Sequence, residues 1–503
     1  MNGPIPVLAV TLTARSTEDA RHQAEESARS GADLAEIRFD LWPDAEYAGI
    51  ARLFPPPIPL IATLRSRAEG GEGPDDPRVR SERILGLSRF PFRWIDLEAA
   101  RDLGLEAELP PPSTLGRIVS SHFPAGVRPD VWARQLREPV PPGGLRKVVA
   151  WSRIGPLLSE LLPEIPSPGT EPAIALTTGP SGPLLRAWSR RFGLPMVFAG
   201  PPALATSGSE DPPVEASQIP IDQLRPFLRA EENAPLFGLA GHPVGHTRSP
   251  RIHARWMARM HHPGLYVPLD FETEGEFVDS LDSLIEWGFR GLNVTHPWKT
   301  AAIQAATDVT GRAEMVGVAN TLIFHGDSIE ADNTDLAAAL RRLEELRRSG
   351  QWDGHSVAVV GTGGAARATL AAARALGIDA SVYGRHRDSA IELAATFDAH
   401  APESGETVVA SLVVHATVVG RAGAGPLEVP LKPLLRPGGH VLDWVYAPTS
   451  PEIRREVEAA GATYEDGRRL LVYQAAATFS TWWGEEPSTE AITEVLRGEG
   501  CTG

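Results

Sequence analysis

LRKVVAWS, residues 145–152, is an apolar run that carries a single lysine. Its Val148, Val149 and Ala150 predict a buried strand, because continuous apolar runs are typical of parallel strands that are covered on both faces. A strand of this kind places Lys147 in the interior of its domain. Similar runs precede and follow it along the first 230 residues, so the strand belongs to a larger repeating arrangement.

Seven further runs resemble it, and nearly all are separated by enough residues for a helix. They are PVLAVTLTA (6–14), DLAEIRFD (33–40), IPLIATLRS (58–66), RWIDLEA (93–99), GRIVSSHF (116–123), PAIALTTG (172–179) and PMVFAG (195–200). Eight strands alternating with helices predict a (β/α)8 barrel. Polar residues gather where the strands end, which is the end of a barrel that carries chemistry. These are Arg38, Asp40, Arg65, Glu98 and His122.

The remaining chain predicts an α/β architecture of different organisation. Residues 201–235 are rich in Pro, Ser and Glu and indicate a loop, a last barrel helix and a linker. VAVVGTGGAARATLAAARALG has the strand, glycine turn and helix of a dinucleotide fold. We therefore expect four parts: a barrel (1–230), an α/β substrate domain (234–335), a Rossmann-like domain (336–470) and C-terminal helices that pack back on the substrate domain (471–503).

Composition narrows the function classes. A net charge of −16 argues against nucleic acid or an anionic membrane as a partner. Cys501 is the only cysteine, so no internal disulfide is possible, and nothing in the sequence suggests an oxidising compartment. The first residues lack a basic leader, and no apolar run reaches membrane-spanning length. We expect a cytoplasmic enzyme with small-molecule substrates and no metal; its oligomeric state stays open.

Lysine is scarce, with three lysines against 45 arginines. An ammonium can lose its proton and attack a carbonyl or relay a proton, whereas a guanidinium cannot. Lys147 and Lys299 lie within informative motifs, and Lys432 is expected in a solvated loop. Because a free lysine has a pKa of about 10.4, Lys147 needs burial and nearby cations to become a nucleophile. Arg38, Arg65 and Arg186 would supply those cations if they converge, and they would also hold an anionic substrate. His122 is then a plausible base and acid.

The motifs AEIRFDLW, ATLRSRAEGGEG, VSSHF, LRKVVAWS and TTGPSGPLLRAWSRRFG together resemble type I 3-dehydroquinate dehydratase over about residues 5–230. The resemblance implies that Lys147 forms a Schiff base with the substrate ketone and that His122 is the general acid and base. It implies that Glu69 orients and charges His122. Five further residues would bind the carboxylate and hydroxyls: Glu36, Arg38, Arg65, Arg186 and Gln218. Val214 departs from the serine that is usual in the family, which puts one substrate hydrogen bond in question.

Several polar residues of the C-terminal half suit a hydroxylated carboxylate. In GHPVGHTRSPRIHA (241–254), Thr247 and Ser249 lie in a turn that opens a helix, where hydroxyls and N–H groups suit a carboxylate. In GLNVTHPWK (291–299), Asn293 and Thr295 share one strand face, and Lys299 follows. Asn320 with Thr321, and Asp335 at the end of ADNTD, complete the set. Taken singly, each of these could be a capping or turn residue.

In this order the motifs are similar to those of shikimate dehydrogenase, from about residue 236 to 500. The resemblance implies that Lys299 and Asp335 are the catalytic pair, which passes a proton to the developing alkoxide. It implies that Thr247 and Ser249 hold the substrate carboxylate. Asn293, Thr295, Asn320 and Gln474 would bind ring hydroxyls, and Tyr446 would line the cleft.

GTGGAARA (361–368) is a variant dinucleotide turn whose glycines let the backbone approach a pyrophosphate. Its expected cofactor contacts are Gly361, Thr362, Gly363, Gly364 and Ala365. The next strand, SVYG, ends without an acidic residue, and Arg385 and Arg387 follow, which favours a 2′-phosphate and hence NADP over NAD. His415 and Leu336 depart from the family's Asn and Gly.

Joined in one chain, the halves predict two consecutive reactions. 3-Dehydroquinate would be dehydrated to 3-dehydroshikimate, which NADPH would then reduce to shikimate. Two alternatives stay open. The dehydrogenase half could act on quinate with NAD, or the barrel could be an inactive scaffold. Whether the intermediate passes directly between the sites is also open.

Overall fold

A computed structural model describes residues 3–167, 173–203, 217–230, 234–245, 247–403, 406–419, 427–446 and 451–501. Val214 lies outside the described residues. By their contacts the residues form two compact units. The first comprises residues 1–236, 243–247 and 263–288, and the second comprises 237–242, 248–262 and 289–503. Within the described residues, no helix is long and apolar enough to cross a membrane.

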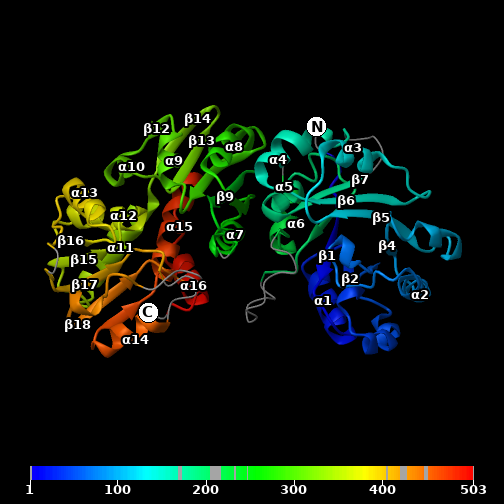
Figure 1. The fold of residues 1–503 in the computed structure, drawn as a ribbon, viewed down its shortest axis with the longest axis horizontal. Coiled ribbons are helices and arrows are strands. Elements are labelled where there is room, and N and C mark those ends of the chain that lie inside the picture. The colour runs from blue at the N-terminus through cyan, green and yellow to red at the C-terminus, as the bar shows by residue number, and fades with distance from the viewer. Residues whose placement is uncertain are drawn as a thin grey trace. The chain divides into compact units, whose positions relative to one another are not determined.

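Eight parallel strands form the N-terminal sheet, which confirms the predicted barrel (Figure 1). They are β1 (Val7–Leu12), β2 (Leu34–Arg38), β3 (Leu60–Thr63), β4 (Trp94–Glu98), β5 (Gly116–Phe123), β6 (Leu145–Trp151), β7 (Ala173–Thr178) and β8 (Met196–Ala199). Their order is β7-β6-β5-β4-β3-β2-β1-β8, so the two strands at the ends of the order are consecutive in the chain. Each strand lies inside one of the predicted apolar runs.

Helical segments follow the barrel strands. They are α1 (Thr17–Arg29), η1 (Phe39–Leu41), η2 (Asp44–Leu53), η3 (Arg67–Glu69), α2 (Pro77–Leu87), η4 (Leu103–Glu108), α3 (Pro129–Arg137), α4 (Ile154–Pro156), η5 (Leu157–Leu161), η6 (Leu162–Glu164), η7 (Gly179–Ser181), α5 (Gly182–Ala187) and α6 (Ile221–Arg229). The strand register matters for the chemistry, because Ser120 on β5 pairs with Lys147 on β6 and with Glu98 on β4. Residues that are far apart in sequence therefore lie side by side at one level of the barrel.

A second sheet has six strands in the order β10-β9-β11-β13-β14-β12. These are β9 (Leu236–Gly241), β10 (Leu265–Asp270), β11 (Phe289–Val294), β12 (Asp308–Val309), β13 (Thr321–His325) and β14 (Ser328–Asp332), with helices α7 (Ser249–Arg259), α8 (Glu274–Glu286), α9 (Lys299–Gln304) and α10 (Gly311–Val316). Antiparallel pairing of β11 with β13 sets Asn293 opposite Thr321. The register therefore places two of the predicted polar motifs beside each other.

The third sheet is the predicted Rossmann-like one, with the parallel order β16-β15-β17-β18-β19 (Figure 1). Its strands are β15 (Ser356–Val360), β16 (Asp379–Tyr383), β17 (Ala410–His415), β18 (Leu435–Asp443) and β19 (Thr463–Glu465). The helices are α11 (Thr334–Arg348), α12 (Gly364–Ala375), α13 (Arg387–Phe397), η8 (Lys432–Leu434), α14 (Pro451–Ala459), α15 (Arg468–Trp483) and α16 (Thr489–Gly498). The chain passes from β15 to β16 on one side and then returns to β17 on the other. The crevice beyond the ends of β15 and β17 is thus the switch point at which open α/β sheets bind ligands.

Candidate active sites

One pocket of about 170 Å³ opens within the barrel. It brings together all eight residues that the sequence predicted for this half: Glu36, Arg38, Arg65, Glu69, His122, Lys147, Arg186 and Gln218. They come from strands or loops spread over more than 180 residues of sequence. The pocket lining is therefore rich in charge of both signs, and its arginines suit a carboxylate ligand.

Lys147 is 4% exposed and points into this pocket from the middle of β6. Its Nζ lies 3.3 Å from Asp96 Oδ2 and 3.4 Å from Glu36 Oε1, and it sits 3.9 Å from the centre of the Phe198 ring. The three arginines expected near it, Arg38, Arg65 and Arg186, line the same pocket, but the charged groups in contact with Nζ are carboxylates. Side chains on β2 and β4 that face the barrel interior carry carboxylates, so the ammonium is paired before any substrate arrives.

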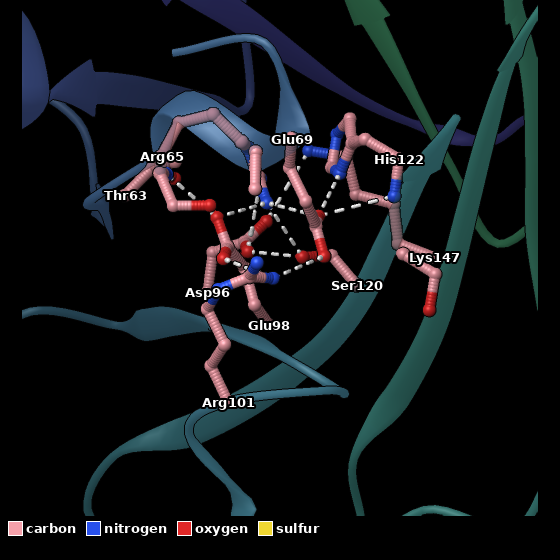
Figure 2. A network of polar contacts seen from close by, with 12 residues as sticks. Thr63, Arg65, Glu69, Asp96, Glu98, Arg101, Ser120, His122 and Lys147 are labelled. Atoms are coloured by element: carbon pink, nitrogen blue, oxygen red, sulfur yellow. Dashed lines mark hydrogen bonds and ion pairs between the residues drawn. The ribbon is translucent and has the colours of Figure 1, made fainter. Parts of the chain in front are cut away.

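Arg65 is the hub of the polar network around the lysine (Figure 2). Its guanidinium lies 3.0 Å from Asp96 Oδ1, 3.1 Å from Glu69 Oε2 and 3.3 Å from Glu98 Oε1. Burial alone would lower the pKa of Arg65, but the carboxylates of Asp96, Glu69 and Glu98 outweigh it and raise this pKa. Burial likewise tends to raise the pKa of Asp96, and the charges of Arg65 and Lys147 hold it below its ordinary value. The arginine therefore favours the ionised form of Asp96.

Asp96 was not among the predicted site residues, yet it contacts both Arg65 and Lys147. It also accepts a hydrogen bond of 2.6 Å from Ser120 Oγ. A signal was present in the run RWIDLEA, where Asp96 and Glu98 are two residues apart on a strand that is otherwise apolar. Residues two apart share a face of the sheet, so this pair of acids had to point into the barrel or out of it together.

His122 and Glu69 form the predicted pair at the pocket edge, and Figure 2 shows Glu69 between the histidine and Arg65. Glu69 Oε2 lies 3.0 Å from Nδ1 of His122 and accepts a bond of 3.1 Å from its backbone N–H. Burial, helped by the acids Glu98 and Asp96 and opposed by Arg65, raises the pKa of Glu69 to about 7. Burial, together with the charges of Arg65, Lys147 and Arg38, lowers the pKa of His122 well below its ordinary value. At neutral pH the imidazole is neutral and free to accept a proton.

The other barrel residues are held in fixed positions. Arg38 pairs with Asp40 at 2.7 Å. The guanidinium of Arg186 donates to the backbone carbonyls of Thr177, Gly182 and Phe198. Gln218 Nε2 donates to Thr11 Oγ1 at 3.1 Å, and that hydroxyl donates to Glu36 at 2.8 Å. Rotation of these side chains would break several bonds at once, so the pocket is organised without a ligand.

In the second unit, the predicted pair Lys299 and Asp335 lies in contact, with Nζ 2.5 Å from Oδ2. Lys299 is the first residue of α9, and Asp335 is the second residue of α11. Asn333 caps α11 by accepting the N–H of Leu336 at 3.1 Å. The cap fixes where α11 begins and so where Asp335 points. The third lysine, Lys432, is exposed as expected.

A buried network of hydroxyls surrounds the two predicted asparagines. Asn293 Nδ2 donates to Thr478 Oγ1 at 3.0 Å and to Thr321 Oγ1 at 3.2 Å. Asn320 Oδ1 accepts the backbone N–H of Thr334 at 2.7 Å. Thr478 was missed by sequence reasoning, although it follows Gln474 by four residues on α15 and so lies on the same helix face.

The other predicted residues of this half lie at the ends of elements. Thr295 directly follows β11, Thr247 precedes α7, and Ser249 is the buried first residue of α7. Tyr446 follows β18 by three residues. Gln474 donates to the carbonyl of Leu471 at 3.0 Å. The structure thus places hydroxyl and amide groups where a helix begins and where strands end.

The glycine turn has the shape of a dinucleotide cradle. Gly361 has a φ of 130°, and a Cβ there would lie 2.5 Å from the carbonyl oxygen of Ala416. By contrast, a Cβ on Gly363 would meet no protein atom within 4 Å, so this side of the turn is open to a ligand. Thr362 precedes that open side, and Ala365 follows as the second residue of α12. An open turn at a helix N-terminus fits a pyrophosphate.

The two predicted arginines follow β16. Arg385 has a side chain that is 66% exposed and lies 3.7 Å from Glu428. Arg387 is the first residue of α13 and donates to the carbonyl of Pro402. Leu336, one of the noted departures, is buried in α11. His415, the other, is buried at the end of β17. Arg385 therefore presents a positive charge where a second strand ends, as a phosphate on an adenosine ribose would need.

Comparison with known proteins finds similarity in both halves. Residues 8–138 match the family model described as type I 3-dehydroquinase. Residues 239–322 match the model described as the shikimate dehydrogenase substrate binding domain. A shikimate dehydrogenase (NADP(+)) from Ruegeria sp. is 37% identical over 275 residues, which is 52% of this chain and 97% of that protein. One from Paracoccus denitrificans is 36% identical over 271 residues, with 52% and 95% covered.

One solved structure aligns with nearly the whole chain. It is described as dehydroquinate dehydratase and shikimate dehydrogenase from S. pombe AroM. The alignment covers 99% of this chain and 98% of that one, at 22% identity and a TM-score of 0.42.

Proposed function

This chain belongs to the shikimate dehydrogenase family and carries a type I 3-dehydroquinase domain ahead of that part, and we propose that the two parts catalyse consecutive reactions. The barrel dehydrates 3-dehydroquinate to 3-dehydroshikimate. The rest of the chain reduces that small-molecule product to shikimate with NADPH. The observation that carries the proposal is the placement of two scarce lysines. Lys147 shares a pocket with His122, and Lys299 contacts Asp335.

In the barrel, Lys147 Nζ attacks the substrate ketone, and loss of one water leaves an iminium. This cation acidifies the adjacent C–H bond, and neutral His122 removes that proton. The electrons form the new C=C bond as the neighbouring hydroxyl departs, and His122 returns its proton to make this hydroxyl water. Hydrolysis of the iminium then frees Lys147 and the product. The net change is the loss of one water from the substrate.

The surrounding residues support these reaction steps. Glu69 orients the imidazole through Nδ1, so the other ring nitrogen serves the substrate. Asp96 and Glu36 hold the ammonium in place, and loss of its proton would release the nucleophilic amine. Arg38, Arg65, Arg186 and Gln218 bind the carboxylate and hydroxyls of the substrate in this proposal.

For the reduction, NADPH supplies a hydride to the carbonyl carbon when it is bound. The chain's part is to hold the ketone and to protonate its oxygen. Lys299 donates a proton to the developing alkoxide, and its contact with Asp335 lets it be reset. Thr247 and Ser249 bind the substrate carboxylate, Asn293, Thr295, Asn320 and Gln474 bind its ring hydroxyls, and Tyr446 lines the cleft. Residues 361–365 would hold the cofactor, and Arg385 and Arg387 would bind its 2′-phosphate.

The alternative of an inactive barrel has less support, because the barrel pocket retains a nucleophile, a neutral base and three arginines. The alternative that the dehydrogenase half acts on quinate with NAD is likewise less supported, because the exposed Arg385 after β16 suits the 2′-phosphate of NADP. We place the functional boundaries at residues 1–230, 234–335, 336–470 and 471–503. With one cysteine in the chain, we further propose that the enzyme works in the cytoplasm.

The direct test is a coupled assay in which NADPH consumption is followed after dehydroquinate alone is added. The wild-type chain should consume NADPH after a lag while dehydroshikimate accumulates. Lys147→Ala should abolish this signal but keep NADPH consumption when dehydroshikimate is supplied. Lys432→Ala, at an exposed lysine, is the matched control and should behave as wild type. Equal activity of the wild type and Lys147→Ala on dehydroquinate would refute the barrel assignment.

A further inference from the structure

The ends of β17 and β18 hold a buried chain of hydrogen bonds that the proposed reaction does not use. His415 Nδ1 lies 2.9 Å from Asp443 Oδ1, and His415 Nε2 lies 2.7 Å from Thr417 Oγ1. Tyr464 donates its hydroxyl to Asp443 Oδ2 at 2.7 Å. Thr417 Oγ1 also accepts the backbone N–H of Val419 at 3.1 Å. The chain thus runs from a tyrosine to a threonine through a fully buried imidazole.

The chemistry of these groups fixes where the protons lie. A carboxylate only accepts, and Asp443 already accepts from Tyr464 and from the N–H of Val445 at 2.9 Å. Nδ1 of His415 must therefore be the nitrogen that carries a proton toward Asp443. With the ring proton on Nδ1, Nε2 is the acceptor of the ring, and the Thr417 hydroxyl donates to it. With its proton committed to His415, Thr417 can offer only a lone pair to anything else.

Thr417 lies at the cofactor crevice. His415 is the last residue of β17, next to β15 in the sheet, and the glycine turn follows β15. A Cβ on Gly361 would lie 2.5 Å from the Ala416 carbonyl oxygen and 3.3 Å from Thr417 Cγ2. The segments that follow β15 and β17 are therefore in close contact at Gly361 and Thr417.

The two sides of this crevice receive different halves of a dinucleotide. Arg385 follows β16 and marks the adenosine side, as the proposed 2′-phosphate contact requires. The opposite side, beyond β17, is left for the nicotinamide half. Thr417 lies on that side. Its half-buried hydroxyl is the first polar side chain after the strand.

We propose that His415 is a positioning residue, which with Asp443 turns Thr417 so that its oxygen accepts a hydrogen bond from the nicotinamide half of the cofactor, by a ribose hydroxyl or the carboxamide NH2. The inference rests on the proposed function, because it needs NADP in this crevice. It adds a contact on the nicotinamide side and a reason for the buried histidine. Nothing in the reduction step itself changes.

Two substitutions at Thr417 test the acceptor. Thr417→Val keeps the shape but removes the oxygen, and it should weaken NADP+ binding to the full-length protein about five- to tenfold, the usual loss for one hydrogen bond. Thr417→Ser keeps the oxygen and should bind as wild type. Binding is measured by calorimetry with NADP+ alone, without substrate. Equal affinity of the wild type and Thr417→Val would overturn the proposal.

A second pair tests the histidine against a matched control. His415→Ala removes the link between Asp443 and Thr417, and should weaken NADP+ binding as much as Thr417→Val does. When the two changes are combined, no further loss is expected, because they act through one contact. His440 on β18 is also buried and bonds a threonine, with Nδ1 2.7 Å from Thr463 Oγ1. His440→Ala should change thermal stability but not NADP+ affinity. Additive losses in the double variant would overturn the coupling.

The ring nitrogen of His415 that carries the proton can be identified directly by NMR. In protein with 15N-labelled histidine, the signals that disappear in His415→Ala should be those of a neutral ring protonated at Nδ1. A ring protonated at Nε2 would contradict the proposed orientation of Thr417. If the proposed function itself failed, the wild-type protein would bind no NADP+, whereas failure of this inference would leave wild-type binding intact and the variants unchanged.

Discussion

A Cβ atom on Gly364 would lie 2.9 Å from Cδ of Lys299. The aliphatic stem of the proposed proton donor therefore packs directly on the turn that holds the cofactor. The same lysine reaches Asp335 with its ammonium at 2.5 Å. Because one side chain touches both, the cofactor turn and the proton donor are positioned by a single contact.

Gly364→Ala should therefore impair the chemistry more than the binding of NADPH. The methyl group would push the lysine stem away from Asp335, and we expect kcat of the reduction to fall about 10- to 100-fold. Gly363→Ala is the matched control, because its methyl group meets no protein atom and should raise the KM for NADPH instead. In a Lys299→Ala background, Gly364→Ala should cost nothing more in steady-state kinetics. A full additional loss there would show that the glycine acts without the lysine.

Borohydride should trap a covalent adduct on one lysine only. With dehydroquinate present, reduction of the iminium should add the substrate mass to Lys147, which peptide mass spectrometry would locate. Lys299 and Lys432 should stay unmodified, since neither is placed to bond a ketone covalently. Arginine is too poor a nucleophile to replace the amine, so Lys147→Arg should give no adduct and no dehydration while reduction continues. An adduct on another residue would exclude the proposed Schiff base.

The pKa of Glu69, raised to about 7, should set the pH dependence of dehydration. In the wild type, kcat/KM should change across pH 6–8 as this carboxyl loses its proton beside His122. Glu69→Gln cannot titrate, so its profile should lack that inflection. Initial rates on dehydroquinate over this pH range would decide between the two, and an unchanged inflection in the variant would assign it to another group.

The same carboxyl should affect stability with a defined sign. Its pKa is 4.5 in the unfolded chain and about 7 in the fold, so the folded state holds a proton that the unfolded state releases between these values. Stability conferred by that proton falls as pH rises through this window. Relative to Glu69→Gln, the wild type should lose on the order of 1–3 kcal/mol between pH 4.5 and 7. Chemical denaturation of both proteins at each pH measures the difference, and a gain would contradict the raised pKa.

Asp96→Asn should impair dehydration in the barrel and leave the reduction of dehydroshikimate intact. The change removes a charge from between Arg65 and Lys147, which lie 3.0 Å and 3.3 Å from its two oxygens. Because both cations are buried, we expect the barrel to lose about 3–5 kcal/mol of stability. Dehydration should fall with it, while reduction of dehydroshikimate should remain. Loss of both activities in equal measure would indicate that the halves do not unfold independently.

Arg385→Gln should change the KM for NADPH but hardly that for NADH. If the exposed guanidinium contacts a 2′-phosphate, the KM for NADPH should rise about 5- to 50-fold, while that for NADH, which lacks the phosphate, should hardly change. Arg374, on α12, offers a control charge in the same domain. Equal losses for both cofactors would remove the phosphate assignment.

Periodicity and short motifs were enough to predict much of this protein. Each of the eight barrel strands lies in an apolar run because parallel strands covered on both faces need one. All eight predicted barrel residues line one pocket, since side chains at the ends of parallel strands meet at the same end of a barrel. The glycine turn could likewise be predicted from sequence, because its glycines act through the local backbone conformation.

The charges around each functional group depended on the folded chain. Asp96 reaches Lys147 across 51 residues and Glu36 across 111, and no local pattern encodes such a pairing. The arginines of the Lys147 pocket were expected, but the two acids in contact with its ammonium were not predicted as its partners. The partners of His415 and the packing of Lys299 on Gly364 also arise only when separate strands and helices come together. Apolar order along the chain is a local property, whereas the electrostatic surroundings of a buried group are set by whatever the fold brings within a few ångströms.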